Sequence, residues 1–427
     1  MSIPPPPTSP LGNDKAWQSI AIPLETPYRI DIKTTSVTIP LLIVRRVNAH
    51  GLMIMSNGAV DLEKTHGDPI FQRSSWWKDI SQHQLYICDP GTTGNNALSL
   101  SWGQINEDYW FIPDASDAVK IISSLLGVVS PENRTYFGSS AGGFLSIALL
   151  AHDAGASALV NNVQFDWTKW MAGGVNKIRH ARFSGKLPKT LREEYPTRTN
   201  VLRLLSHKNQ VSPIHYCLNT ASRHDTSVDL PEINNFREKN TDLSKYIQIH
   251  AYRDPVAGHN PLGKAQTVNL INQFPLEDPN RKITFPHMNS ITAEFDIPSS
   301  VNSFRPAIRL SKDIKSREIV GLITGSGNPN LTSDHVDGYK WSAGLNGFYR
   351  YINGEHSAGS ILYLPRLHTK HIGNRLSLQL IPWGNPNSTP DQSVDNVVLD
   401  SIARPGNLLI FASKLLRVNN EAWEVSS

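Results

Sequence analysis

The sequence is poor in cysteine and nearly balanced in charge. Its 427 residues include only Cys88 and Cys217, each in an apolar run, so we expect buried thiols and neither a disulfide framework nor a metal site. The formal net charge of +4 is small for this length and gives no reason to expect nucleic-acid binding by the chain as a whole. A composition of 39% hydrophobic and 18% charged residues is typical of a globular protein with a sizeable core.

Long apolar runs are also missing. No stretch approaches the roughly 18 apolar residues of a membrane span. Residues 1–10 are polar and rich in proline, without the basic and apolar regions of a signal peptide. We therefore expect a cytoplasmic protein without stable membrane insertion, in which residues 1–20 form a flexible tail. The sequence also contains no phosphate-binding glycine loop with its lysine, so no bound cofactor is expected.

One short motif stands out against this background. Residues 138–142 read Gly-Ser-Ser-Ala-Gly and fit the pattern G-x-S-x-G. The aromatic and β-branched residues 135–137 before it are typical of a strand, and the run rich in Ala, Leu and Ile after it is typical of a helix. A strand, a glycine turn and a helix predict a nucleophile elbow with Ser140 as the nucleophile, the alternative being a structural turn.

The order of residues along the chain suggests partners for this serine. On the fold that carries such an elbow, the triad order is Ser, then Asp or Glu, then His. Asp225 follows the predicted strand 215–218 and is our candidate for the acid, with Asp229 in reserve. His259 lies in a glycine-containing loop after the predicted strand 246–252 and is the candidate base. It would take the proton of Ser140, while Asp225 would orient the imidazole.

The loop after the predicted strand 52–55 reads Asn-Gly-Ala at residues 57–59. Such a loop supplies one backbone N–H of an oxyanion hole, so Gly58 and Ala59 are candidate donors, with Ala141 as the second. An ordinary Asn-Gly turn is the alternative. Candidates for substrate contact are His224, Asn57 and Gln164.

Alternating strand and helix patterns predict a mostly parallel sheet flanked by helices over residues 21–276. Within it, residues 168–212 form a basic insertion, predicted to be a cap. Ten Lys and Arg lie between positions 169 and 208, with only Glu193 and Glu194 as acids. Such a cap would favour an anionic substrate, although a solvated helical face explains the charges equally well. In the aromatic and basic loop 69–77, the paired Trp76 and Trp77 favour core positions over sugar stacking.

The pattern changes after a predicted linker at residues 277–281. Short strands separated by turn residues predict an all-β, sandwich-like domain over residues 283–420. Its aromatic residues fit glycan binding, and a purely structural role is equally compatible.

The residues of the first part together resemble a known family, the α/β-hydrolase-like proteins encoded with bacterial capsule and cell-surface glycopolymer synthesis genes. The resemblance covers about residues 45–265. It is carried by residues 56–61 with 69–73, by Asp89-Pro90, by 136–143, by 162–164, by Asn219 with His224, and by 257–261. Where this family tends to carry an acid, three residues after the asparagine matching Asn219, the chain has Ser222. Asp225 would then be a shifted substitute.

The resemblance implies an α/β-hydrolase fold and the activity of a polysaccharide O-acetyltransferase or esterase. It also implies an acylated or anionic carbohydrate substrate, acetyl-coenzyme A as the acyl donor of a transferase, and association with a glycopolymer assembly complex. Two hypotheses follow. One is a serine enzyme of acyl transfer or ester hydrolysis, and the other is a non-catalytic binding or scaffold protein that uses the same fold.

Overall fold

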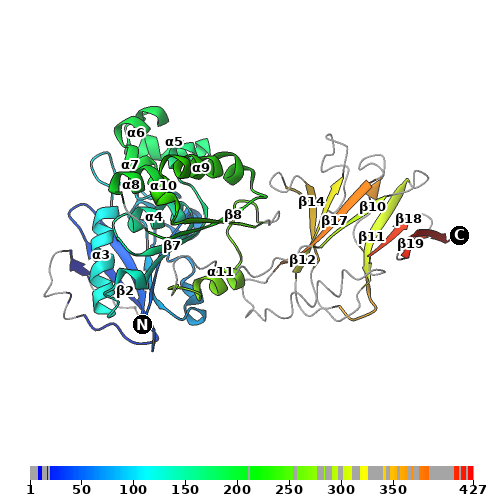
Figure 1. Cartoon of the computed structure of the whole chain (residues 1–427), viewed down its shortest axis with the longest axis horizontal. Coiled ribbons are helices and arrows are strands. Elements are labelled where there is room, and N and C mark those ends of the chain that lie inside the picture. The colour runs from blue at the N-terminus through cyan, green and yellow to red at the C-terminus, as the bar shows by residue number, and fades with distance from the viewer. Residues whose placement is uncertain are drawn as a thin grey trace. The chain divides into compact units, whose positions relative to one another are not determined.

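A nine-stranded sheet forms the centre of the first part of the chain (Figure 1). Its strand order is β1-β2-β3-β5-β4-β6-β7-β8-β9, and every pairing from β5 to β9 is parallel. The strands are β1 (Thr8–Pro10), β2 (Pro27–Lys33), β3 (Thr38–Val44), β4 (Leu52–Ser56), β5 (His83–Ile87), β6 (Arg134–Ser140), β7 (Ser157–Val163), β8 (Ile214–Asn219) and β9 (Ile247–Tyr252). The predicted mostly parallel sheet is confirmed.

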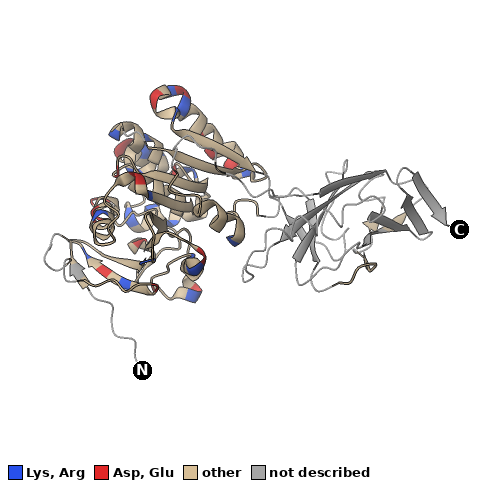
Figure 2. Cartoon of the chain, turned by 60° about the horizontal axis from the view of Figure 1, so that its bottom comes forward, with Lys and Arg blue, Asp and Glu red and all other residues tan. Residues whose placement is uncertain are grey.

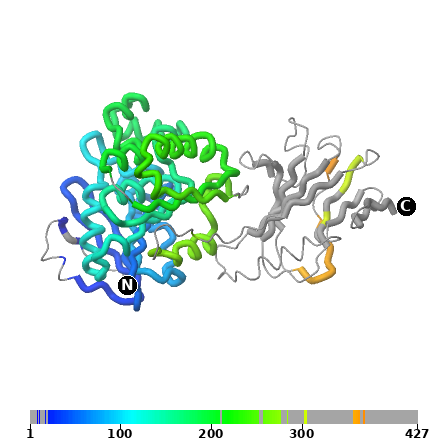
Figure 3. Tube along the Cα trace, in the orientation of Figure 1, coloured from blue at the N-terminus to red at the C-terminus, as the bar shows by residue number. Residues whose placement is uncertain are grey.

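The computed structural model describes residues 8–11, 17, 20–209, 212–252, 257–276, 283, 291–296, 302–309, 318–325, 340–342, 347–352, 356–363, 367–368, 375–383, 408–412, 415–419 and 422–426. Most of the predicted tail (residues 1–20) and the whole predicted linker (277–281) lie outside these residues. The chain divides into two units, the first comprising Met1–Tyr252, His259–Leu262 and Gln266–Phe285, and the second the remainder. The trace in Figure 3 follows the first unit from blue to green.

Helices flank the sheet of the first unit. They are α2 (Leu62–Thr65), α3 (Ile112–Leu125), α4 (Ala141–Leu150), α5 (Ala172–Arg182), α6 (Pro188–Glu194), α7 (Pro196–Thr199), α8 (Val201–Lys208), α9 (Leu230–Lys239), α10 (Thr241–Ser244) and α11 (Lys264–Ile271). All ten residues of α4 are buried, because its Ala, Leu, Ile and Phe side chains present an apolar surface on every side. Across the described residues, no helix combines the length and apolarity needed to cross a membrane.

Shorter turns complete the unit. They are the 3₁₀ turns η1 (Ser74–Asp79), η2 (Pro90–Thr92), η3 (Pro131–Asn133) and η4 (Trp167–Lys169), and the π-helical turn η5 (Asp225–Asp229). Helix α3 ends at Leu125, shortly before Gly127, which takes a left-handed backbone conformation with φ 78°.

The basic insertion between β7 and β8 contains α5 to α8. Several of its cations have structural partners. The guanidinium of Arg198 donates to Gln104 Oε1 and to the carbonyl of Glu107, and burial lowers its pKa to about 10. Lys186 bridges Glu107 and Glu194 at 2.7 and 2.8 Å. Figure 2 shows basic and acidic positions interspersed on the helices of this unit. These contacts favour the interpretation of the charges as a structural, solvated face.

In the second unit, the described strands pair in two antiparallel sheets, with the orders β10-β17-β12-β14-β13 and β15-β11-β18-β19-β20. The strands are β10 (Ile291–Asp296), β11 (Ser303–Arg309), β12 (Glu318–Gly325), β13 (Lys340–Ser342), β14 (Gly347–Ile352), β15 (Ile361–Tyr363), β16 (Leu367–His368), β17 (Arg375–Trp383), β18 (Leu408–Ala412), β19 (Leu415–Asn419) and β20 (Ala422–Ser426). The sandwich-like domain over residues 283–420 stays a prediction.

Candidate active site

The turn between β6 and α4 is sharp and strained at Ser140. This residue has φ 55° and ψ −124°, a conformation that costs a residue with a side chain of order 1–3 kcal/mol. The glycines on either side are required by close approach. A Cβ at Gly138 would lie 2.1 Å from the carbonyl oxygen of Gly142, and one at Gly142 would lie 2.7 Å from the carbonyl oxygen of Ser56. The turn therefore holds the Ser140 side chain at the carboxyl end of the sheet.

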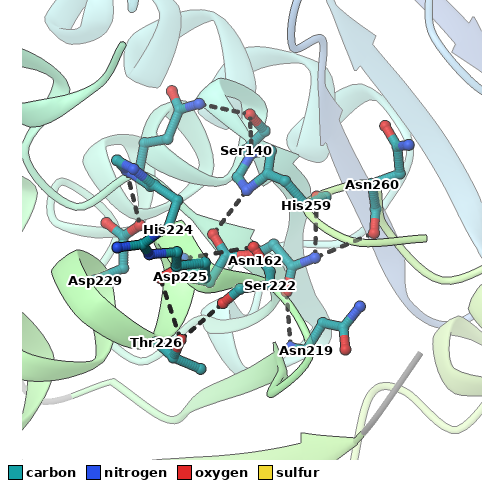
Figure 4. Close-up of polar contacts among 12 residues, drawn as sticks. Ser140, Asn162, Asn219, Ser222, His224, Asp225, Thr226, Asp229, His259 and Asn260 are labelled. Atoms are coloured by element: carbon teal, nitrogen blue, oxygen red, sulfur yellow. Dashed lines mark hydrogen bonds and ion pairs between the residues drawn. The ribbon is translucent and has the colours of Figure 1, made fainter. Parts of the chain in front are cut away.

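Three side chains from distant parts of the chain form one hydrogen-bonded series at this turn (Figure 4). Ser140 Oγ lies 2.8 Å from His259 Nε2, and His259 Nδ1 lies 2.7 Å from Asp225 Oδ1. Asp225 is fully buried. The carboxylate can only accept, so it keeps a proton on Nδ1 and leaves Nε2 free to accept the proton of Ser140. This tautomer is the one that a general base requires.

Asp225 lies in a helical segment, not in the loop that we expected after β8. It is the first residue of η5, which continues directly into α9. Such π-helical turns are rare and occur frequently at functional sites. Ser222 lies one turn earlier, and its Oγ is 3.5 Å from the backbone N of Asp225.

The reserve candidate, Asp229, contacts a different set of groups. Its Oδ1 accepts from the backbone N–H of Phe165 at 3.2 Å, and its Oδ2 lies 3.6 Å from His224 Nε2. Burial, and then the charge of Asp225, raises the pKa of Asp229 well above its usual range. Asp229 resists ionisation and contacts His224 instead of His259, so it is unsuited to orient the base.

The loop that carries His259 is held by two asparagines at the end of β7. Asn162 Nδ2 donates to the carbonyl oxygens of His259 and Asn260 at 3.0 and 3.1 Å, while Asn161 Oδ1 accepts from the backbone N–H of Leu262 at 2.8 Å. The ring of Trp170 packs against the imidazole of His259 with a centroid separation of 4.6 Å. These contacts fix the position of the imidazole. No local pattern pointed to Trp170, which follows a 3₁₀ turn after β7.

Gln164, expected to contact substrate, instead contacts Ser140 directly. It is 1% exposed, and its Nε2 lies 2.7 Å from Ser140 Oγ. Its Oε1 accepts from the indole N–H of Trp102 at 2.7 Å. Because an indole N–H can only donate, Trp102 fixes the amide with its NH₂ toward Ser140. The hydroxyl of Ser140 thus accepts from Gln164 and donates its own proton to His259.

Of the three candidate oxyanion donors, one already has a hydrogen-bond acceptor within the protein. The N–H of Gly58 donates to Gln72 Oε1 at 2.9 Å, and Gln72 Nε2 donates in turn to the carbonyl of Ala59 at 2.7 Å. Within the described residues the N–H of Ala59 has no hydrogen-bond partner. Ala141 is the first residue of α4, where backbone N–H groups lack an intrahelical acceptor. Ala59 and Ala141 are therefore the donors left open.

Two other candidates for substrate contact also have internal partners. Asn57 is 2% exposed, and its Oδ1 accepts from the backbone N–H of Asp89 at 2.7 Å, so it ties together the loops after β4 and β5 and is not placed to contact substrate. His224 packs edge-on against Trp170 with a centroid separation of 4.6 Å. Burial lowers the pKa of His224. His224 lines the base side of the site, with a ring centroid 6.4 Å from that of His259.

Comparison with family models and with curated proteins finds no match. Similar solved structures include the capsule O-acetyltransferase of Neisseria meningitidis serogroup A, 13% identical over 54% of this chain and 87% of that one, with a TM-score of 0.40. Porphyromonas gingivalis dipeptidyl peptidase 4 is 16% identical over 54% of this chain and 32% of its own, with a TM-score of 0.39. Pyrococcus horikoshii acylaminoacyl peptidase is 12% identical over 56% and 39%, with a TM-score of 0.40. What the site does is therefore inferred from its own geometry.

Proposed function

We propose that this chain is a serine-dependent enzyme of acyl transfer or ester hydrolysis, built on an α/β-hydrolase fold. One observation supports it above all: the series from Ser140 Oγ through His259 to Asp225, with separations of 2.8 and 2.7 Å. A structural glycine turn needs neither a strained serine nor a buried carboxylate behind a histidine. In the proposal Ser140 is the nucleophile, His259 the general base, and Asp225 the group that orients and stabilises the imidazolium.

The reaction proceeds in two halves. Ser140 Oγ attacks the ester carbonyl carbon while its proton passes to His259 Nε2, and the oxyanion accepts hydrogen bonds from the N–H groups of Ala59 and Ala141. The C–O bond to the alcohol breaks, and His259 returns the proton to the departing oxygen. A water or a sugar hydroxyl then attacks the acyl-enzyme, again losing its proton to His259, and Ser140 is released with its proton.

The proposed substrate is an acylated glycan or an anionic cell-surface polysaccharide, on the support of the family resemblance over residues 45–265. Water as the second acceptor makes the protein an esterase. A sugar hydroxyl makes it an O-acyltransferase with acetyl-coenzyme A as the donor. In that case the first half breaks the C–S bond of the thioester, and His259 returns the proton to the departing thiolate. A cytoplasmic location and association with a glycopolymer assembly complex complete the proposal.

A fluorophosphonate probe tests the nucleophile. We expect one labelled site in the wild-type protein and loss of labelling in Ser140→Ala. Ser124→Ala is the matched control, because Ser124 is an exposed serine on α3. Equal labelling of wild type and Ser140→Ala, or no labelling of either, contradicts the mechanism and favours the non-catalytic binding or scaffold role. Acetyl-coenzyme A with candidate glycans then separates transferase from esterase.

A further inference from the structure

A positively charged side chain lies beside the nucleophile turn, and among the described residues it has no carboxylate partner. Arg73 Nη2 donates to Ser139 Oγ at 2.7 Å, the one hydrogen bond of this side chain within the described residues. Its guanidinium carbon lies over the rings of Trp76 and Phe137, at 5.7 and 5.2 Å from their centroids. The aromatic residues of loop 69–77, for which we expected core positions, are half-buried at Trp76 and Trp77.

Placing Arg73 there is costly. The residue has φ 68°, in the left-handed region that costs an ordinary residue roughly 1–2 kcal/mol. Burial lowers the pKa of its guanidinium to about 10, and the group that opposes this effect is the phenol of Tyr86, not a carboxylate of the described residues. A neutral donor would satisfy Ser139 Oγ equally well, and part of the desolvation cost of this half-buried charge is not compensated by a counterion. The ring contacts with Trp76 and Phe137 favour a cation at this position, but they use none of its remaining N–H groups.

The remaining N–H groups of Arg73 face accessible space. Its Nε and Nη1 have no hydrogen-bond partner in the described part of the chain, and neither atom is fully buried. Since Ser139 directly precedes Ser140, Arg73 Nη2 lies no more than about 9 Å from the Cα of Ser140. The neighbouring Gln72 holds the loop of the candidate oxyanion donor Ala59. The guanidinium thus lies beside the nucleophile turn and next to the residue that holds the loop of Ala59.

We propose that Arg73 is an anion subsite that binds a carboxylate or phosphate group of the ester substrate. A guanidinium presents parallel N–H groups that match such oxyanions, and the ring contacts with Trp76 and Phe137 hold its plane. This inference rests on the proposed acyl-transfer function, which makes the bound anion part of a substrate. It makes the enzyme selective for anionic esters through one residue and not through the charged cap.

Paired esters test the subsite. Mono-4-nitrophenyl succinate carries a carboxylate on the acyl side and 4-nitrophenyl butyrate is a neutral counterpart, while 4-acetoxybenzoate and its methyl ester place the charge on the alcohol side. We expect wild type to prefer the anionic member of at least one pair in kcat/KM. Arg73→Met should lower that preference by about tenfold or more while neutral esters are still hydrolysed, and Arg73→Lys should fall between. The pair whose preference falls in Arg73→Met shows whether Arg73 binds the acyl side or the alcohol side of the ester.

A second measurement is independent of turnover. Inorganic phosphate should raise the Tm of wild type and of Ser140→Ala, and should not raise that of Arg73→Met. Lys177→Met removes an exposed charge on α5 and should preserve both the ester preference and the phosphate effect. Equal loss on anionic and neutral esters in Arg73→Met, or an unchanged phosphate effect, overturns the subsite. If no ester is hydrolysed but the phosphate effect still depends on Arg73, the proposed function fails and the anion site stands.

Discussion

The amide of Gln164 donates to the hydroxyl of Ser140 across 2.7 Å, and the indole of Trp102 holds that amide in place from its other side. Ser140 therefore has one hydrogen-bond donor and one acceptor, Gln164 and His259, and its proton has a single direction in which to point. A hydroxyl aligned in this way loses no conformational freedom when it transfers its proton, which is the advantage of preorganised catalytic groups.

Substitution of Gln164 should reveal this alignment. Gln164→Met removes the donor that orients the hydroxyl and should lower the rate of fluorophosphonate labelling by roughly 10²-fold, the order of loss that follows when a reacting group is misplaced. Gln164→Glu should be slower still at pH 8, because a carboxylate accepts the proton of Ser140 and draws it away from His259. If Gln164 only contacted substrate, its substitution would change KM for an ester, and the labelling rates would not fall in the order wild type, Gln164→Met, Gln164→Glu.

Asp225→Asn should lower kcat by roughly 10³–10⁴-fold with little change in KM, because an amide at this position favours the wrong imidazole tautomer. Asp229→Asn is the matched control, since Asp229 is a second buried acid four residues on and lies off His259. Steady-state hydrolysis of an activated ester measures both. A larger loss in Asp229→Asn than in Asp225→Asn would reverse the assignment of the acid.

Gly142→Ala should abolish labelling of Ser140 and destabilise the protein, because the new Cβ would lie 2.7 Å from the carbonyl oxygen of Ser56, where backbone must move. Gly173→Ala on α5 is the control. A Cβ at Gly173 meets nothing within 4 Å, and alanine is the better helix former by about 1 kcal/mol, so this variant should keep activity and gain stability. Thermal unfolding and probe labelling of the two variants make the comparison.

His152 should make stability depend on pH. Burial, and then the charges of Lys208 and Lys120, lower the pKa of His152 from 6.5 to about 4. Above pH 6.5 both folded and unfolded states carry a neutral ring. As the pH falls below 6.5, His152 binds a proton in the unfolded state but stays neutral in the folded state. The free energy of unfolding therefore decreases until about pH 4, where the folded state is protonated too.

Urea unfolding of wild type and His152→Gln at pH 7.5, 6 and 5 measures this effect as a difference between the two proteins. The variant should lose less stability on acidification. His180→Gln, at an exposed histidine of α5, should follow the wild type. Parallel curves for wild type and His152→Gln would contradict the prediction.

Local patterns were enough to predict the elements that carry the site. The strand before Ser140 and the helix after it follow from β-branched and aromatic residues on one side and Ala and Leu on the other, and the structure has β6 and α4 there. The chain order of Ser140, Asp225 and His259 then followed from the parallel sheet. Their catalytic roles remain a proposal, although the structure brings the three side chains together.

The side-chain hydrogen bonds that surround Ser140 could not be predicted from local sequence patterns. Trp102 and Gln164 are 62 residues apart, and Arg73 and Ser139 are 66 apart, so no local periodicity relates them. The occupied N–H of Gly58 depends on Gln72, which belongs to a loop rather than to a strand or helix. Side-chain hydrogen bonds between loops are fixed by the packed fold, and sequence spacing carries no signal for them.

The π-helical turn at Asp225 has a consequence for how such a site changes over time. Ser222 stands just before the helical segment, and its hydroxyl faces the N–H of Asp225 at 3.5 Å, as a helix N-cap does. Capping the helix and orienting the base are thus assigned to separate residues, one turn apart. The two positions can therefore change independently: substitution of Ser222 alters the start of the helix, while the contact that orients His259 depends on Asp225 alone.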